Sequence, residues 1–570
     1  MPATTSAPAC PPTTSGPAPD VDEAVGYLPE MPALREGVEI SQAEGEDHAV
    51  VSVAPEGRYL RMGRDAAVLL SGLDGSRNRE DVLAQWSAAV GQQGASELLA
   101  QLWGLGLLHN PKGPPPARER AFTYRKPLSF QFTLVRPQRL TAGMRTLGGV
   151  LARRPFPQLY LALLVAGAVA IAVDHQGFLR AISTPVPSGT VFHVWMVTLA
   201  VGALHEFGHA TALAYFGGRP RRMGVMLFYF FPAFFCDVSA GWKLSDRGHR
   251  VRVALSGVTV NAAVAAGAAI VAALKGGEAA QFWWLLTVYN LISTAFNLLP
   301  FVKLDGYLAL MGRVDVPFLR NKAISDARAW LGRVLYGHPP NEKSLDRPWS
   351  VPFGLAAITF PVVWMGYMLT RVLPSMLFWG KTGTVLWLMI IALAGSRLLY
   401  GMARIAFPVG RGGRRQASLR RRLLGLGMVG AAVAALLCAV PVDATTKAGY
   451  VLQNGQPVLV VPTAGGAVGA IHPGDRIELR SAGLIRSPVL ATAVVDGPAS
   501  GPVQVSSAAF SPLKHASGHT EAIRYSLRQV DGHTLPSAGK ATAHTGTTTI
   551  AGRLAETYLL PPLRLLTGLG

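Results

Sequence analysis

The sequence predicts a polytopic α-helical membrane protein of about seven transmembrane helices, with a small N-terminal winged-helix-like α+β domain and a C-terminal all-β extracytoplasmic domain. Two observations lead to this fold class. Half of the 570 residues are hydrophobic and only 15% are charged, a composition too apolar for an ordinary soluble enzyme. The apolar residues also gather in runs long enough to cross a hydrocarbon core of roughly 30 Å at about 1.5 Å per helical residue.

The first 155 residues are predicted to lie outside the membrane. Residues 1–47 begin with a stretch rich in Pro, Thr, Ala and Ser, which predicts a disordered tail and lacks the basic-then-apolar pattern of a signal peptide. Residues 48–110 predict two short strands, in HAVVSVAP and RYLRMG, followed by three amphipathic helices, an order typical of a winged-helix-like unit. Residues 111–155, which begin with PKGPPPARER, predict a linker.

Residues 156–441 are predicted to form the transmembrane core. Its apolar runs lie near residues 156–173, 191–216, 251–273, 281–301, 352–370, 382–400 and 423–441. Arginine clusters border these runs, and all the clusters fall on one side of the membrane if the runs cross it alternately. Because basic loops face the cytoplasm, we expect a multi-pass protein of the bacterial cytoplasmic membrane with a cytoplasmic N-terminus.

Residues 442–570 follow the last apolar run and are expected on the external side. They contain short alternating stretches such as QPVLVVP and DRIELRS. Alternation of apolar and polar residues is typical of half-buried strands, so this segment predicts an all-β domain.

The formal net charge of +20 does not indicate nucleic-acid binding. The arginines stand in short loops beside apolar runs, as in GGRPRRM, and no basic stretch is interleaved with aromatic residues. The expected partner of this chain is therefore the lipid bilayer and not a nucleic acid. The three cysteines, Cys10, Cys236 and Cys438, lie far apart, which excludes a disulfide framework and a cysteine zinc site.

The second apolar run contains the segment LHEFGHA, in which two imidazoles and a carboxylate stand among apolar residues. His205 and His209 are four residues apart, so on a helix they project from one face and can both ligate a zinc ion. Glu206 lies beside them, where a carboxylate can accept a proton from a water molecule. Ionisable side chains are costly inside a membrane, which favours a functional reading over two helix-packing histidines with a chance glutamate.

A zinc site of this kind needs a third protein ligand, and two aspartates are candidates. Asp305 follows Pro300 at the end of the fourth run, where a broken helix can direct a carboxylate into the bundle. The alternative for Asp305 is an Asp-Gly turn that only ends a helix. Asp237 is the second candidate, but a turn or an interhelical hydrogen bond explains it better. The sequence therefore favours Asp305.

These residues resemble the site-2 protease family of intramembrane zinc metallopeptidases. HEFGH at residues 205–209 and NLLPFVKLDG at residues 297–306 match the HExxH and NxxPxxxxDG signatures of that family. The resemblance implies that His205, His209 and Asp305 bind Zn²⁺, that Glu206 is the catalytic base, and that Asn297 contacts the substrate.

A further segment, SGVTVNAAVAAG, resembles the GPxxN helix of the same family, with Val258 where proline is usual. The resemblance implies that Asn261 hydrogen-bonds the substrate backbone. The alternative is a polar contact between packed helices.

Two other resemblances bear on the substrate. Residues 48–110 look like the PqqD-type peptide-recognition domain, which binds leader peptides of ribosomally made natural products. The segment FPAFFCDVSAGWKLSDRGHRVRVALSG resembles the peptide zinc metalloproteases of bacterial peptide clusters of the daptide-like kind, whose tails can resemble membrane-fusion adaptors. The aromatic run at residues 228–235 either lines a peptide groove or packs against lipid and neighbouring helices.

Three functions remain open at this point. The first is an intramembrane zinc protease that removes a leader from a small peptide or otherwise matures it. The second is a regulatory protease that cuts a membrane-anchored signalling protein. The third is a non-catalytic component of peptide export. The intact set of His205, Glu206, His209 and Asp305 disfavours the third.

Overall fold

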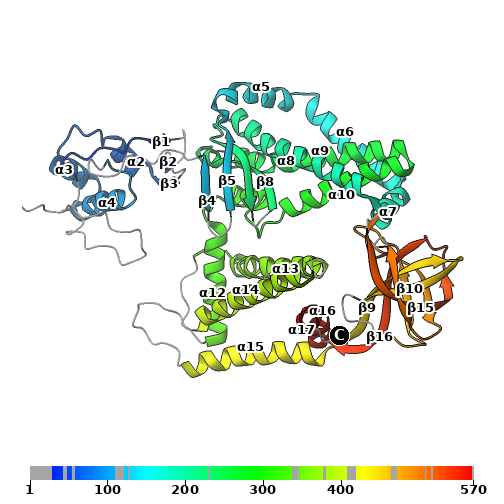
Figure 1. The fold of residues 1–570 in the computed structure, drawn as a ribbon. Helices are drawn as coiled ribbons and strands as arrows, with labels where there is room; N and C mark the ends of the chain where they lie inside the picture. Colours follow the sequence, from blue (N-terminus) through cyan, green and yellow to red (C-terminus); the bar gives the residue numbers. More distant parts are fainter. Residues whose placement is uncertain are drawn as a thin grey trace, which may run out of the picture. The chain divides into compact units, whose positions relative to one another are not determined.

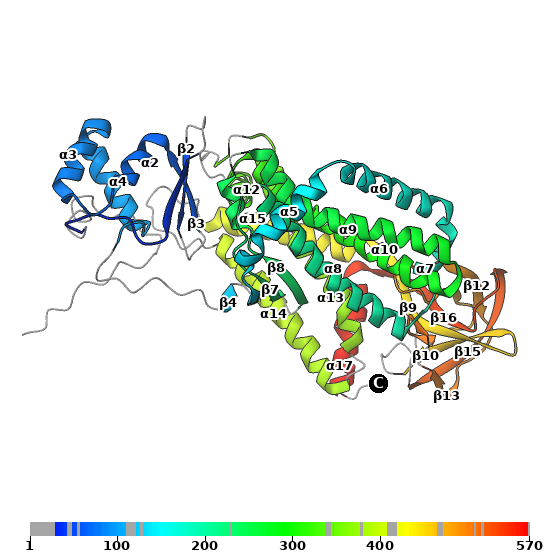
Figure 2. The same cartoon turned by 90° about the horizontal axis from the view of Figure 1, so that it is seen from above.

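The structure is a computed structural model. It describes residues 29–42, 48–53, 58–109, 121–125, 129–228, 231–244, 246–336, 344–345, 347–376, 380–406, 419–463, 471–506, 509–514 and 518–567. The chain forms two compact units. The first combines Met1–Gly148 with Ala210–Val253, and the second combines Gly149–His209 with Ala254–Gly570. Figure 1 and Figure 2 show the helices and strands of both units along the chain.

The N-terminal part of the first unit is a three-stranded antiparallel sheet that shares a core with three helices. Its elements are β1 (Val38–Gln42), β2 (His48–Val53), β3 (Arg58–Gly63), α2 (Arg64–Ser71), α3 (Arg79–Val90) and α4 (Gln92–Gly104), and the strand order is β1-β2-β3. Val51 and Val53 of the sheet are buried together with Leu70, Trp86 and Leu99 of the helices. The segment is thus an α+β unit, and its winged-helix character stays a prediction.

Strand β1 lies inside residues 1–47, where the sequence predicts a disordered tail. Val38 and Ile40 alternate toward the shared core and are partly buried against it, and Ile40 pairs with Val51 of β2. The alternating pair is too short to stand out beside the Pro- and Thr-rich start of the chain. Residues 1–28 lie outside the described residues.

A second sheet in the first unit also corrects the sequence prediction. Its strands are β4 (Phe122–Arg125), β5 (Ser129–Val135), β7 (Met223–Phe228) and β8 (Phe231–Cys236), all antiparallel in the order β4-β5-β7-β8. Strands β4 and β5 and helix α5 (Thr141–Ala152) fall within residues 111–155, predicted as a linker. That prediction rested on the Pro-rich residues 111–120, which lie outside the described residues. Of the aromatic run at residues 228–235, Phe228 ends β7 and residues 231–235 lie in β8, whereas residues 229–230 lie outside the described residues.

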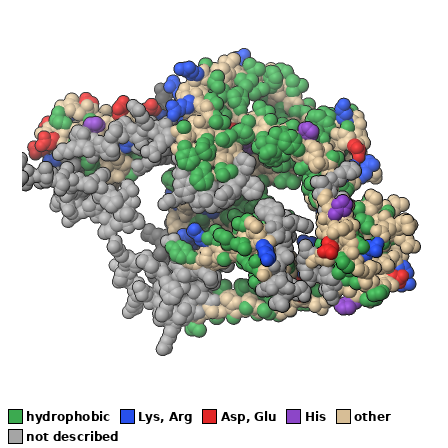
Figure 3. Space-filling model, viewed as in Figure 1, with side chains coloured by type: hydrophobic (Ala, Val, Ile, Leu, Met, Phe, Trp, Pro, Cys, Tyr) green, Lys and Arg blue, Asp and Glu red, His purple; other side chains and the backbone are tan. Residues whose placement is uncertain are grey.

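Most of the second unit is helical, and four helices are long and apolar enough to cross a membrane. They are α6 (Phe156–Val173), α8 (Ser188–Tyr215), α9 (Arg247–Lys275) and residues Ser350–Thr370 of α13 (Ser350–Met376). Apolar side chains of α6 are turned outward, with Leu161 62% and Val173 77% exposed. Figure 3 shows hydrophobic side chains gathered over this group of helices. Such exposed apolar surface is typical of a membrane protein.

The seven predicted spans are not confirmed as a set. The other three predicted runs form α10 (Gly277–Asn297), α14 (Gly380–Ala406) and α15 (Leu419–Ala439). Among the described residues these helices do not meet the same criterion of length and apolarity, although Gly427–Ala439 of α15 is a shorter apolar stretch.

Small residues allow the helices of the second unit to pack closely. A β-carbon at Gly167 of α6 would collide with the backbone of Ala266 of α9. Ala269 and Ala272 of α9 are buried with Trp284 of α10. Close approach through Gly and Ala is typical of helix packing in membranes.

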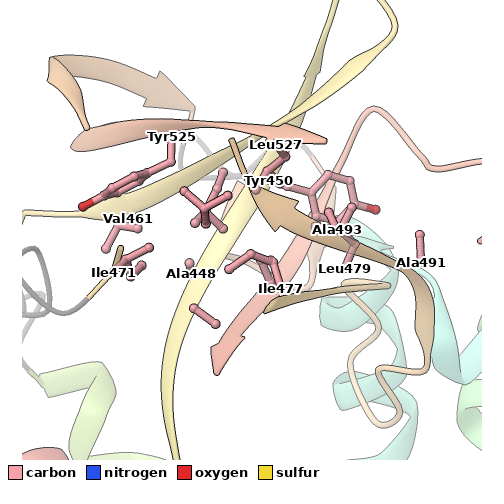
Figure 4. Close-up of a cluster of buried hydrophobic side chains, with 14 residues drawn as sticks. Ala448, Tyr450, Val461, Ile471, Ile477, Leu479, Ala491, Ala493, Tyr525 and Leu527 are labelled. Atoms are coloured by element: carbon pink, nitrogen blue, oxygen red, sulfur yellow. The ribbon is translucent and has the colours of Figure 1, made fainter. Parts of the chain in front are cut away.

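The C-terminal region is rich in β-structure. Its strands are β9 (Pro441–Gln453), β10 (Gln456–Pro462), β11 (Arg476–Arg480), β12 (Val489–Val495), β13 (Ser500–Ser506), β15 (His519–Gly532) and β16 (Ala538–Thr549), in the order β10-β9-β16-β11-β12-β15-β13. An additional pairing of β10 with β15 closes the sheet on itself. Alternate residues point inward, and Figure 4 shows the core around Tyr450, Ile477, Leu479 and Tyr525.

The predicted all-β domain ends in two helices, α16 (Ile550–Tyr558) and α17 (Leu560–Thr567). Helix α17 packs against α14, and the indole of Trp387 in α14 donates a hydrogen bond to the carbonyl of Tyr558, at 3.1 Å. The segment is short and lies beyond the last alternating stretch, so strand periodicity gave no sign of it. The region is therefore β-rich and not purely β.

Candidate metal centre

Helix α8 brings the two histidines of the HEFGH segment together. His205 and His209 are one helical turn apart, and their side chains leave the same face of the helix. Both residues are buried, with exposed fractions of 8% and 4%. Their Nε2 atoms lie 3.3 Å apart. The spacing read from the sequence thus produces a pair of converging imidazoles.

Asp305 completes the group from a different part of the chain. It is the first residue of α11 (Asp305–Val314), which follows the turn after α10. One carboxylate oxygen, Oδ2, lies 3.0 Å from Nε2 of His205, and Oδ1 lies 3.3 Å from Nε2 of His209. Among the described residues, these three form the one group of His, Cys, Asp or Glu side chains close enough to hold a metal ion together.

The spacing of the three side chains fits a zinc ion. Two ligand atoms that each lie about 2.0 Å from a tetrahedral ion are separated by about 3.3 Å. The two Nε2 atoms lie 3.3 Å apart, and each faces a different oxygen of the Asp305 carboxylate, at 3.0 and 3.3 Å. With one ligand atom taken from each residue, all three atoms lie within 4.8 Å of one another. Two imidazoles and one carboxylate are also a ligand set that zinc accepts in catalytic sites, where a fourth position stays open for water or substrate.

Helix α9 passes close to the two imidazoles at Gly257, which has no side chain. A β-carbon at Gly257 would collide with Nε2 of both His205 and His209. A larger residue at this position would therefore displace the imidazoles or the backbone of α9. The backbone of α9 also approaches Gly208 of α8, since a β-carbon there would lie 3.1 Å from the carbonyl oxygen of Ser256.

Ser256 also orients one of the histidines. Its Oγ lies 3.3 Å from Nδ1 of His209, the nitrogen that does not face Asp305. A partner on the second nitrogen fixes the tautomer and the ring orientation of a metal-binding histidine. Nδ1 of His205 is buried and has no hydrogen-bond partner among the described residues.

Glu206 is half-buried on α8, between the two histidines in sequence. The sequence predicts that this carboxylate accepts a proton from the attacking water. Its role as the catalytic base stays a prediction.

The alternative third ligand, Asp237, has other partners within the first unit. Its carboxylate accepts hydrogen bonds from the backbone and hydroxyl of Ser239 and from Nε of Arg222, the last at 3.5 Å. Burial raises the pKa of Asp237, but the hydrogen bonds from Ser239 and the charges of Arg221 and Arg222 outweigh it and hold this pKa below its usual value. These hydrogen bonds fit the prediction that Asp237 stabilises a turn and does not bind the metal.

The two asparagines predicted to contact substrate meet at one serine. The side-chain amide of Asn261 in α9 donates to Oγ of Ser293 in α10 at 2.9 Å, and Asn297 donates to the same oxygen at 3.4 Å. This is the interhelical polar contact that the sequence left open for Asn261. The substrate-binding role of Asn261 and Asn297 stays a prediction.

Sequence reasoning did not single out Gly257, Ser256 or Ser293. The signal for the first two was present, because they open the segment that resembles the GPxxN helix. Ser293 is an isolated polar residue in an apolar run, and only the packing of α9 on α10 reveals its two amide partners.

Comparisons with protein-family models, with curated proteins and with solved structures found no match to this chain. The functional interpretation consequently depends on the sequence motifs and on the geometry of the His205, His209 and Asp305 group.

Proposed function

We propose that this chain is an intramembrane zinc metalloprotease related to the site-2 protease family. The observation that carries the proposal is the convergence of His205, His209 and Asp305, whose ligand atoms lie within 4.8 Å of one another. Two segments about one hundred residues apart in sequence produce this cluster, and each belongs to one of the two motifs that suggested the family.

The chemistry follows from the residues around this cluster. A zinc ion bound here supplies a Lewis acid that makes a water molecule acidic near neutral pH. Glu206 accepts a proton from the attacking water and returns it to the nitrogen of the leaving amine, so the same carboxylate acts first as base and then as acid. Ser256 keeps the ring of His209 in orientation, and Gly257 keeps the space beside both rings open.

We propose the membrane arrangement read from the sequence. Seven helices cross the bacterial cytoplasmic membrane, with the N-terminus in the cytoplasm and the C-terminal β-rich region outside. Four helices of sufficient length and apolarity support a multi-pass protein. Reporter fusions at residues 110 and 450 test the orientation, and reporters that fall on the same side contradict it.

The substrate we propose is a peptide precursor. The α+β unit of residues 48–110 is expected to act as a winged-helix-like, PqqD-like domain that captures a leader segment. Export components are expected as further partners. A membrane-anchored signalling protein is the alternative substrate. The alternative to a protease is a non-catalytic role in peptide export.

The experiment uses the full-length protein reconstituted in liposomes. We expect one zinc ion per chain, cleavage of a leader-bearing precursor, loss of cleavage after removal of the metal by a chelator, and recovery on adding zinc. A protein that binds no zinc at micromolar concentrations contradicts the proposal. A zinc-loaded protein that cleaves only membrane-spanning helices supports the regulatory alternative.

A further inference from the structure

We propose that Arg320 is a positioning residue for Asp305. Its guanidinium donates one hydrogen bond to the turn that precedes Asp305. It donates another to the carbonyl in α13 that lacks a helical donor because of Pro361. The inference rests on the proposed function, because it concerns the capacity of Asp305 to bind zinc.

The first half of the argument concerns α13. Pro361 lies within this helix and has no backbone N–H. The carbonyl of Ala357, four residues earlier, therefore lacks its usual intrahelical donor. An unsatisfied carbonyl is costly in a helix that crosses a membrane. Nη2 of Arg320, from α12 (Leu319–Tyr336), donates to this carbonyl at 2.9 Å and so replaces the missing donor.

The second half concerns the turn between α10 and α11. Nε of the same guanidinium donates to the carbonyl of Phe301 at 3.1 Å. Phe301 lies four residues before Asp305, in a segment that belongs to neither helix. The backbone N–H of Arg320 also donates to the hydroxyl of Tyr307 in α11, at 3.2 Å. One rigid, planar group thus joins the turn that leads to Asp305 to helix α13.

The platform on which Arg320 stands is closely packed. A β-carbon at Gly354 of α13 would collide with the carbonyl of Ala323 in α12. Ala323, Ala327 and Ala357 are fully buried along this contact. The ring of Phe301 in turn packs on Phe353 of α13, with ring centroids 5.7 Å apart. Because α12 and α13 cannot shift easily against each other, the hydrogen bond to Phe301 fixes the turn relative to both helices.

The test measures equilibrium zinc affinity of the full-length protein in detergent, by competition with a chromogenic chelator. Arg320→Met removes both side-chain hydrogen bonds while keeping an apolar stem. We expect about tenfold weaker zinc binding, at the lower end of the losses that follow removal of groups supporting metal ligands. Arg320→Lys keeps the charge and can reach one of the two carbonyls, so its zinc affinity should lie between those of the wild type and Arg320→Met. Arg333→Met, an exposed site on the same helix, should bind zinc like the wild type.

A double variant separates positioning from a merely structural role. Pro361→Ala supplies a backbone N–H that can donate to the carbonyl of Ala357. When it is combined with Arg320→Met, the carbonyl of Phe301 still lacks its hydrogen bond from Arg320. We expect the double variant to regain thermal stability relative to Arg320→Met but to keep the weakened zinc binding.

Two results overturn the inference: wild-type zinc affinity in Arg320→Met, or full recovery of zinc affinity in the double variant. Either result leaves the proposed function intact, because both require a wild-type protein that binds zinc. A wild type that binds no zinc contradicts the proposed function itself.

Discussion

Replacing Gly257 by alanine should weaken zinc binding although alanine is the better helix former. In the interior of α9, alanine is favoured over glycine by about 0.5–1 kcal/mol in helix propensity. The added methyl group, however, would occupy the space taken by Nε2 of both His205 and His209. The carbonyl of Ser256, the residue before Gly257, already lies close to α8 at Gly208, so α9 has little freedom to move away.

The size of the effect follows from the overlap. Forcing a methyl group into a closely packed site costs about 1–3 kcal/mol. The strain falls on the two atoms that would bind the metal, so most of it should appear as lost zinc affinity. At about 1.4 kcal/mol for each factor of ten, the expected loss is about five- to 140-fold.

Gly267→Ala provides a matched control in the same helix. A β-carbon at Gly267 meets nothing within 4 Å, so this variant should keep wild-type zinc affinity and gain slightly in thermal stability. Zinc affinity of both variants is measured in detergent with a competing chelator, together with thermal unfolding of the zinc-free forms. Unchanged zinc affinity in Gly257→Ala would refute the view that α9 is shaped around the two imidazoles.

The remaining predictions concern the third ligand and the N-terminal unit. Asp305→Ala should reduce bound zinc well below one ion per chain by metal analysis, whereas Asp237→Ala should keep the zinc and lower stability by about 1–3 kcal/mol, because it removes an acceptor from the partly buried Arg222. Full zinc occupancy in Asp305→Ala would contradict the assignment. Deleting residues 1–110 should leave the zinc content unchanged and raise the KM for a leader-bearing peptide by about one hundredfold, as expected when a tethered binding site is lost. Equal KM values for the two forms would remove the leader-capture role and favour the regulatory alternative.

The pair of histidines could be read from the sequence because their convergence depends on local helix geometry. An i, i+4 pair of histidines converges on any helix. For Asp305, the sequence predicted only that a helix broken after Pro300 could direct the carboxylate into the bundle. The structure begins a new helix, α11, at Asp305, which the sequence did not predict. The close approach of Asp305 to the histidines required tertiary packing, for which the sequence offered the position of Asp305 after Pro300 and the resemblance to a family.

Other features could not be read locally. Strand β5 pairs with β7, about ninety residues later in the chain, and neither the aromatic run nor the Pro-rich start of residues 111–155 indicates that pairing. Arg320 looks like one of many basic loop residues, because only the structure shows that its guanidinium meets the carbonyl freed by Pro361. Strand β1 was hidden by the composition of the residues that precede it.

The most direct test of the central claim is the cleavage rate of Glu206→Gln measured beside its zinc content. The amide cannot accept a proton from water, while His205, His209 and Asp305 are untouched. We predict full zinc occupancy with cleavage reduced at least one hundredfold, within the range of about 10² to 10⁴ typical of a general base. Glu556→Gln, at an exposed position of α16, should cleave like the wild type. A Glu206→Gln protein that holds zinc and retains more than about one hundredth of wild-type cleavage would contradict the account, because the carboxylate beside the metal ligands would then not be the base.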